Sequence, residues 1–352
     1  MFMKVGNIAL LISLFFLILS CSEEKIITEL SPDKNILVAT YDGAVAKLSR
    51  LTFPNGEVIN NDVYSEANGK PISNNKITQI ATYLQHIYIV IPEDYKVVVL
   101  DRTTFKLITE FSFKEENQKP RKLVFANATE AYLIFDDYDY VYLIDTYYNK
   151  IARKIQLEGN ASDILAVGNQ VYITIPLKNQ LSIFDTRTHK VESNIQIENV
   201  PYLVQKNADG SKIIVLCAGI GKIPGDFREA ISYPSVVAID FITNSILSTN
   251  EIKPPKVDLL KEYPKLFIIT NNDWGFFATD KYLIRIDAKQ TKYSSIIEET
   301  GYSELLHNNI YNEFYLLLNL NNQSLIHQVD PILAKKKDKL TLNHYVTYFA
   351  LM

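Results

Sequence analysis

Acidic, basic and aromatic side chains gather in short segments between apolar runs. One segment is Glu93-Asp94-Tyr95, and another is Asp136-Asp137-Tyr138-Asp139-Tyr140. Tyrosine offers a large rigid surface and one hydroxyl, so these segments suit a polar ligand that carries flat apolar parts. Carboxylate-rich runs can also bind Ca²⁺, but no glycine gives 136–139 the tight loop that such a site needs. We therefore expect a ligand site rather than a metal site.

The sequence contains none of the local motifs that mark common catalytic sites. It has no Gly-x-Ser-x-Gly elbow, phosphate-binding loop, His-Glu-x-x-His or Cys-x-x-Cys. The five histidines show no ligand spacing. We expect neither an enzyme nor a bound cofactor, and a Ca²⁺-dependent propeller hydrolase assembled from scattered residues is the alternative. The net charge of −4 argues against nucleic acid as a partner.

The polar segments are separated by a recurring phrase: an apolar strand that ends in aspartate, a turn and another strand. It ends at Asp101, Asp145, Asp185, Asp240, Asp287 and Asp330, which are 44, 40, 55, 47 and 43 residues apart. A degenerate first copy covers 44–49 and carries Ser49 in the aspartate's place. Seven copies, each with room for four short strands, predict an all-β fold, a seven-bladed β-propeller.

The unit around Asp145 shows the expected strands well, at 122–125, 131–135, 140–144 and 150–157. Each aspartate is expected to end the third strand and to accept backbone N–H groups of the following turn. The ring must also close, because closure removes free sheet edges. Either 26–30 or 345–351 can supply the closing strand, and the sequence does not choose between them.

The fold must place the polar segments on one face. Loops from second to third strand, and loops between blades, lie over the central opening of a propeller, and we predict that this face binds a small ligand. The alternative is that polar, tyrosine-rich loops only reflect an exposed β protein. The predicted ligand-binding residues are Asp94, Tyr95, Arg121, Asp137, Tyr138, Tyr202, Phe227 and Arg228, the last two in a long insertion over 218–234.

The N-terminus has the features of an export signal. Lys4 precedes an apolar run over 8–19 that is too short to span a bilayer comfortably. The run ends in Ile18-Leu19-Ser20-Cys21, which resembles the bacterial lipobox. That resemblance implies acylation of Cys21 and cleavage before it, so that lipid chains hold the protein on a membrane. We expect 1–20 to be a lipoprotein signal peptide, 21–30 the lipidated cysteine and tether, and 31–352 the propeller.

Residues after the cysteine bear on location. Ser22-Glu23-Glu24-Lys25 resembles the acidic signal that sends some Bacteroidota-type lipoproteins to the outer face of the outer membrane. We therefore expect an outer-membrane, surface-exposed lipoprotein, with the periplasmic face as the alternative. Cys217 is the only other cysteine, so the mature domain has no internal disulfide.

The repeats resemble the YncE-like (YVTN-type) seven-bladed propellers, above all a branch of surface lipoproteins in Bacteroidota-type bacteria. The resemblance rests on 87–90, 97–101, 104–106, 120–121, 131–133 and 141–145. Some members of that branch capture cobalamin and pass it to a TonB-dependent transporter, which implies nutrient capture with such a transporter here. The sequence lacks the Tyr-Val-Thr-Asn phrase itself, so the ligand stays open. The alternative is a scaffold or adhesion component of an outer-membrane protein complex.

Overall fold

The computed structural model describes residues 34–352 except 198, 220–231, 256, 299–300, 310 and 322. The expected signal peptide and the whole of 21–30, the lipidated cysteine and tether, lie outside the described residues, as do Phe227 and Arg228. None of the described helices is long and apolar enough to cross a membrane.

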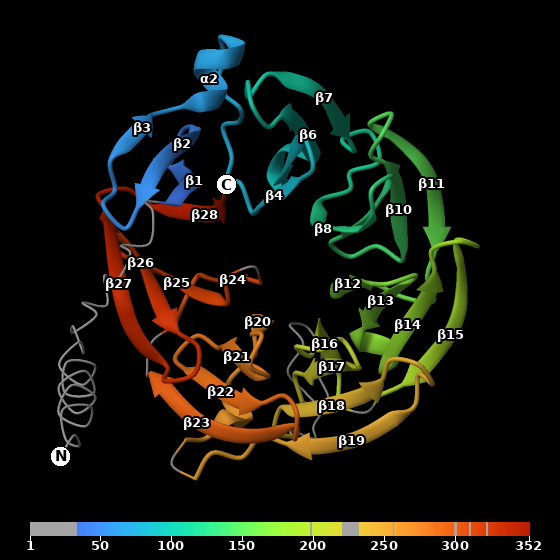
Figure 1. The fold of residues 1–352 in the computed structure, drawn as a ribbon. Coiled ribbons are helices and arrows are strands. Elements are labelled where there is room, and N and C mark those ends of the chain that lie inside the picture. The colour runs from blue at the N-terminus through green and yellow to red at the C-terminus, as the bar shows by residue number, and fades with distance from the viewer. Residues whose placement is uncertain are drawn as a thin grey trace, which may run out of the picture. The chain divides into compact units, whose positions relative to one another are not determined.

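The described strands form seven four-stranded antiparallel sheets, the blades of a propeller (Figure 1), which confirms the predicted fold class. In blades two to seven the strands follow chain order from the innermost outward. The strands of blades two to four are β4 (Gln79–Tyr83), β5 (His86–Ile91), β6 (Lys96–Asp101), β7 (Leu107–Ser112); β8 (Pro120–Asn127), β9 (Glu130–Phe135), β10 (Tyr140–Asp145), β11 (Lys150–Gln156); β12 (Asp163–Val167), β13 (Gln170–Ile175), β14 (Gln180–Asp185) and β15 (Lys190–Gln196).

Blades five to seven repeat this order. Their strands are β16 (Pro201–Lys206), β17 (Lys212–Cys217), β18 (Ser235–Asp240), β19 (Ile246–Glu251); β20 (Leu266–Ile269), β21 (Trp274–Ala278), β22 (Leu283–Asp287), β23 (Lys292–Glu298); β24 (Glu304–Asn308), β25 (Glu313–Leu320), β26 (Gln323–Asp330) and β27 (Lys335–Leu342). The innermost strands β4, β8, β12, β16, β20, β24 and β28 each contact the next, and β28 contacts β4. The blades therefore form a closed ring.

Blade one joins the two ends of the propeller. Its order is β28 (Val346–Leu351), β1 (Lys34–Tyr41), β2 (Ala46–Phe53) and β3 (Val58–Asn60), with β28 innermost. The closing strand thus comes from 345–351, one of the two candidate segments, while the other, 26–30, lies outside the described residues. Ser49 does not end a strand as predicted: β2 continues past it, because Arg50 and Leu51 still pair with β3, and the Ser49 hydroxyl donates to the Asn61 carbonyl at 2.6 Å.

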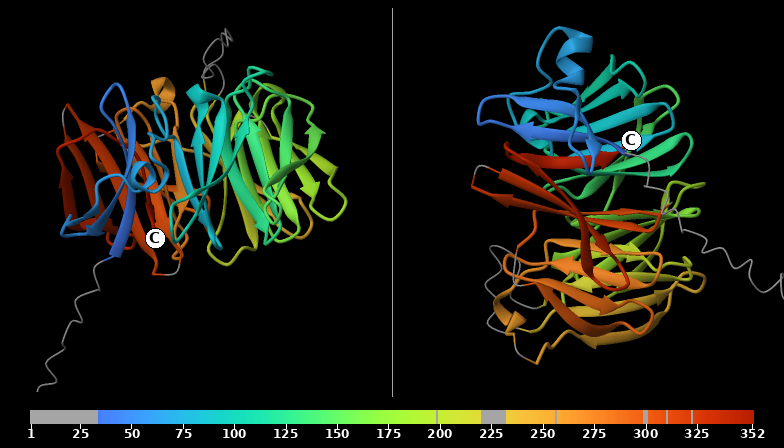
Figure 2. Two further views of the ribbon diagram at one scale, coloured as in Figure 1. Left: turned by 90° about the horizontal axis from the view of Figure 1, so that it is seen from above. Right: turned by 60° about the vertical axis from the view of Figure 1, so that its left-hand side comes forward.

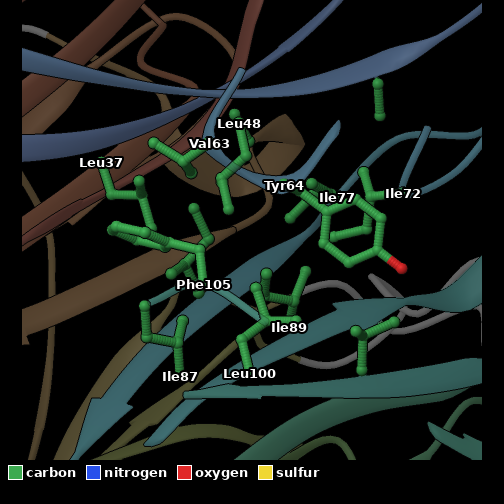
Figure 3. Packing of buried hydrophobic residues seen from close by; sticks show 14 of the residues in the cluster. Leu37, Leu48, Val63, Tyr64, Ile72, Ile77, Ile87, Ile89, Leu100 and Phe105 are labelled. Carbon is green, nitrogen blue, oxygen red and sulfur yellow. The ribbon is translucent and has the colours of Figure 1, made fainter. Parts of the chain in front are cut away.

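Seven hydrophobic clusters fill the spaces between neighbouring blades. Alternate side chains of a strand face opposite neighbours: Ile87 and Ile89 pack toward blade one, while Tyr88 and Val90 pack toward blade three. Figure 3 shows the cluster between blades one and two, to which the short helix α2 (Val63–Asn68) adds Val63 and Tyr64. Both faces of the sheets are thus buried at their inner strands, whereas outermost strands such as β11 and β15 are largely exposed.

The turns divide between two faces of the ring (Figure 2). Turns from first to second and from third to fourth strand meet at one end, where the Arg102 N–H donates to the Gln85 carbonyl at 2.8 Å. Loops from second to third strand and between blades meet at the other end, where the Phe113 N–H donates to the Tyr95 carbonyl at 2.7 Å. We call the first end the lower face and the second the upper face. The described part of the chain also contains three short 3₁₀ helices, η1 (Pro92–Asp94), η2 (Pro176–Lys178) and η3 (Leu259–Lys261).

Candidate functional site in the central cavity

A cavity of about 310 Å³ lies on the axis of the ring, near the upper face. Its walls come from the starts of the innermost strands and the residues just before them, and every blade contributes. The lining residues are Thr78, Gln79, Arg121, Lys122, Ser162, Asp163, Leu203, Gln205, Lys265, Leu266, Phe267, Ile268, Glu304, Leu305 and Tyr348. A single ligand in this space contacts several blades at once.

A second hollow of about 350 Å³ lies on the outside of the ring, between α2, β3 and the turn after β6. Its one carboxylate, on Glu66, already accepts a hydrogen bond from the Asn60 amide at 2.5 Å. The central cavity has several charged groups and walls from all seven blades, so we take it as the candidate site.

Six lining residues occupy equivalent positions of their blades, and we call them the cavity tier. Each pairs with the fifth residue of the second strand, as Gln79 does with Val90 and Glu304 with Leu317. The tier consists of Gln79, Lys122, Asp163, Leu203, Leu266 and Glu304. The repeat therefore places four polar or charged side chains and two leucines at one level of the axis.

Three polar members of the cavity tier, Gln79, Lys122 and Asp163, form hydrogen bonds or an ion pair with neighbouring blades. The Gln79 amide both donates to and accepts from the Leu123 backbone, at 2.9 Å each way. The Lys122 ammonium lies 2.5 Å from one carboxylate oxygen of Asp163, and the other oxygen accepts the Val204 N–H at 2.8 Å. These groups link blades two to five, since buried polar atoms need partners.

Glu304 is the exception in the cavity tier. Its carboxylate accepts the N–H of Leu305 at 3.0 Å, and no cation of the described chain lies within ion-pair distance of it. Burial raises the pKa of Glu304 to about 7, against smaller opposing effects of the Leu305 N–H and the positive charge of Lys122. Burial, together with the charge of Glu304, also raises the pKa of Tyr348 on β28.

Arg121 forms a polar cluster on the blade-three side of the cavity. Its guanidinium donates to the Asp136 carboxylate at 3.0 Å and to the Tyr202 hydroxyl at 3.1 Å. The ring of Tyr263 packs edge-on against Tyr202, with centroids 4.7 Å apart. Burial opposes ionisation of Tyr202, but the charge of Arg121 and the hydrogen bond from its guanidinium favour the ionised form, and the pKa of this phenol is lowered.

The structure brings two of the predicted ligand-binding residues together. Arg121 lines the central cavity, and Tyr202, on blade five, accepts a hydrogen bond from Arg121. Both lie at the starts of innermost strands, β8 and β16, where the upper face meets the axis.

Asp94 and Tyr95 lie instead on the β5–β6 loop and do not line the cavity. The Asp94 carboxylate accepts from Ser73 and Asn75, at 2.7 Å each, and lies 3.4 Å from the Lys96 ammonium. It ties down the segment that leads into β4. Tyr95 ends η1 in a left-handed conformation at φ 56°.

Asp137 and Tyr138 also lie away from the cavity, on the β9–β10 loop. Asp137 is exposed and adopts φ 60°, as a turn residue does. The Tyr138 hydroxyl donates to the carbonyls of Glu116 and Asn117, at 3.2 Å each, so it fastens the loop between blades two and three.

The structure adds lining residues that are not among the eight predicted ligand-binding residues, namely the cavity tier and Tyr348. Within the described ranges, no three His, Cys, Asp or Glu side chains form a metal-ligand group. The one cysteine of the described chain, Cys217, is buried, and burial raises the pKa of its thiol to about 12.

Solved structures with a similar fold belong to diverse proteins. Kuenenia stuttgartiensis hydrazine synthase has 14% identity and a TM-score of 0.58, over 71% of this chain and 75% of that chain. The Neurospora crassa Pan2 WD40 domain has 12% identity and a TM-score of 0.55, over 76% and 79%. The dihydro-heme d1 dehydrogenase NirN in complex with DHE has 9% identity and a TM-score of 0.57, over 89% and 68%. At these identities the likeness shows the propeller fold alone.

The comparison with curated proteins finds no match. A family model does match: the one described as a domain of unknown function, DUF5074, covers residues 49–228, just over half of the 352 residues. The matched region runs from blade one to the insertion of blade five and includes Arg121, Lys122 and Asp163 of the cavity. The chain therefore belongs to the DUF5074 family.

Proposed function

We propose that the chain is a binding propeller that holds a small polar ligand in its central cavity and does not turn it over. The cavity of about 310 Å³, with charged groups from opposite blades, carries this proposal. Small-molecule sites occupy roughly 300–1,000 Å³ and combine apolar walls with a few directed polar groups. The absence of local catalytic motifs from the sequence favours binding over catalysis.

We further propose that lipid on Cys21 anchors the propeller to the outer membrane at the cell surface. There it would pass its ligand to a TonB-dependent transporter, as the resemblance to YncE-like surface lipoproteins implies. A corrinoid is larger than the central cavity, so cobalamin would rest across the upper face, whereas a smaller nutrient fits inside. The cavity therefore favours a nutrient smaller than cobalamin.

A ligand screen tests the binding proposal. The purified protein is examined by ligand-observed NMR with amino acids, amines, carboxylic acids, sugars, nucleosides and cobalamin. Thr78 is an exposed lining residue, so Thr78→Trp should fill the cavity without disturbing the core. Arg121→Gln should weaken binding of ligands that contact the blade-three side. Tyr138→Phe is the matched control, because Tyr138 lies outside the cavity.

Binding that is lost in Thr78→Trp and retained in Tyr138→Phe supports the cavity as the site. Equal binding by wild type and Thr78→Trp overturns it, and chemical turnover of a bound ligand overturns the non-enzymatic role. Cobalamin binding that survives Thr78→Trp would move the site to the upper face.

The anchor has its own test. Cys21→Ser should release the protein from the membrane fraction, because acylation needs the thiol of Cys21. External protease should degrade the wild-type protein on intact cells. Soluble and membrane fractions unchanged by Cys21→Ser contradict the lipid anchor, and full protection from protease places the propeller on the periplasmic side.

A scaffold role is the second candidate, favoured by apolar side chains on the lower face. Tyr147 and Tyr148, in the β10–β11 turn, are 72% and 68% exposed, and Ile242, in the β18–β19 turn, is 86% exposed. Exposed apolar groups of this kind often mark protein interfaces. Tyr148→Ser with Ile242→Ser should then abolish stoichiometric co-purification of a membrane partner, while Thr78→Trp should leave it unchanged. The reverse pattern supports the cavity function alone.

A further inference from the structure

All but one of the charged side chains that line the central cavity form an ion pair. Lys122 pairs with Asp163, Arg121 with Asp136, and Lys265 with Asp280. Glu304 alone has no cationic partner among the described residues. The cavity and its bordering ion pairs therefore carry one unmatched negative charge when Glu304 is ionised.

Glu304 also lies in surroundings that discourage a bare charge. The innermost strands beside it place Leu266 and Tyr348 along the same cavity wall, and Leu305 follows it in the chain. The side chains that are charged or titratable around the cavity are Lys265 just before β20, Tyr348 on β28, and Arg121, Lys122 and Asp163 from blades three and four. An ionised carboxylate with apolar neighbours is costly unless a cation joins it.

We propose that the central cavity selects a small organic amine whose ammonium group pairs with the Glu304 carboxylate. The inference rests on the proposed binding function and names its ligand class. Leu203, Leu266 and Phe267 offer apolar walls for the body of the amine, and the Tyr348 ring is suited to contact a cation.

The arrangement of the blades supports an amine over an anion. Glu304 is on blade seven and Arg121 on blade three, so the two groups face the axis from nearly opposite sides of a seven-bladed ring. Arg121 is already bound to Asp136 and Tyr202, which reduces its pull on an anionic ligand. The charged group of the site that has no ion-pair partner among the described residues is the Glu304 carboxylate.

Benzylamine and benzyl alcohol are suitable probes, because they share shape and size and differ in charge at pH 8. Their dissociation constants are measured by NMR titration with wild type, Glu304→Gln and Arg121→Gln. Charge-assisted hydrogen bonds predict that wild type binds benzylamine about tenfold more tightly than benzyl alcohol. Glu304→Gln should remove this preference but still bind benzyl alcohol, which shows that its cavity is intact. Arg121→Gln should keep the preference.

The pH dependence separates pairing with Glu304 from general attraction to an acidic protein. The pKa of Glu304 is raised to about 7, so the carboxylate is mostly protonated at pH 6 and mostly ionised at pH 8. Benzylamine stays protonated over this range. Protonated Glu304 should bind benzylamine about as weakly as Glu304→Gln does. The affinity of wild type should therefore rise about fivefold from pH 6 to pH 8, and the affinity of Glu304→Gln should stay level.

The outcomes are distinguishable. If both probes bind equally, or if only neutral or anionic compounds of the screen bind in the cavity, the amine preference is overturned while the binding function stands. If Glu304→Gln keeps the tenfold preference, the partner of the amine is another group and the inference fails. If no compound binds in the cavity, the proposed function fails with it.

Discussion

Aspartates at the ends of third strands act on the turns that follow them. Asp101, Asp145, Asp240 and Asp330 each accept two backbone N–H groups with one carboxylate oxygen, at 2.7–3.0 Å. Hydrogen bonds from the Leu333 and Ile332 N–H groups, and then the neighbouring Lys337, hold the pKa of Asp330 below its ordinary value. The predicted structural role of these residues is therefore confirmed.

Replacement of Asp330 should show how much its two hydrogen bonds contribute to the free energy of unfolding. Asp330→Ala leaves the N–H groups of Ile332 and Leu333 without their acceptor and should lower the free energy of unfolding by about 1–2 kcal/mol in urea denaturation. Asp330→Asn keeps an acceptor oxygen and should lose less. Because the folded pKa of Asp330 is lowered, the difference between wild type and Asp330→Asn should shrink as the pH falls below about 4. Equal stability of Ala and Asn variants at neutral pH would contradict the turn role.

Residue type was enough to predict part of the candidate site, but the other lining residues could be found only by comparing equivalent positions of the blades. Arg121 and Tyr202 stand out as polar residues beside apolar strands, and the structure joins them. Gln79, Lys122 and Asp163 precede their aspartates by 22, 23 and 22 residues, a spacing that indicates equivalent positions. Glu304 precedes Asp330 by 26 residues, because β25 and β26 are longer than their counterparts, and this shift hides it.

Second strands carry a repeated inter-blade latch made by tyrosine. Tyr88, Tyr132 and Tyr172 are fully buried at the third position of β5, β9 and β13. Their hydroxyls reach Asn149, His189 and Asn244, at 2.9, 3.2 and 3.3 Å, each a turn residue of the next blade with positive φ. Some of the many tyrosines therefore have a structural role. The sequence does not separate them from tyrosines that could bind a ligand, because the distinction depends on which strands lie side by side.

A double-mutant cycle measures the latch between blades two and three. Tyr88→Phe removes the hydroxyl, and Asn149→Gly removes its acceptor while it tolerates the φ of 48°. Each substitution should destabilise the fold, and the coupling free energy between them should be about 1 kcal/mol in chemical denaturation. Tyr147→Phe, an exposed tyrosine in the same turn, serves as the control and should show no coupling with Tyr88→Phe. Additive effects of Tyr88→Phe and Asn149→Gly would show that the latch contributes nothing beyond packing.

On the scale of the whole molecule, the ring depends on a pairing between its two chain ends. Val38 of β1 pairs with Phe349 of β28, more than 300 residues apart in the sequence. The repeat pattern predicted the need for such a strand but not its identity, because both end segments, 26–30 and 345–351, contain apolar residues that suit a strand. The structure decides by register, with Phe349 and Val346 packed between blades seven and one.

Because the ring is closed through blade one, we expect a destabilising substitution in blade one to lower the stability of all seven blades. Phe349 is fully buried, so Phe349→Ala should lower the free energy of unfolding by about 3–5 kcal/mol, whereas Tyr345→Ala, at an exposed neighbour, should have little effect. Trp274, the only tryptophan, lies on blade six, where Arg285 covers its ring at 4.4 Å, and its fluorescence reports on a region that Phe349 does not touch. If the closed ring unfolds as one unit, Trp274 fluorescence and far-ultraviolet circular dichroism should shift to the same lower denaturant midpoint in Phe349→Ala. A Trp274 transition that stays at the wild-type midpoint, while circular dichroism shows an early loss, would mean that blade one opens alone and that closure is not what makes the seven blades cooperative.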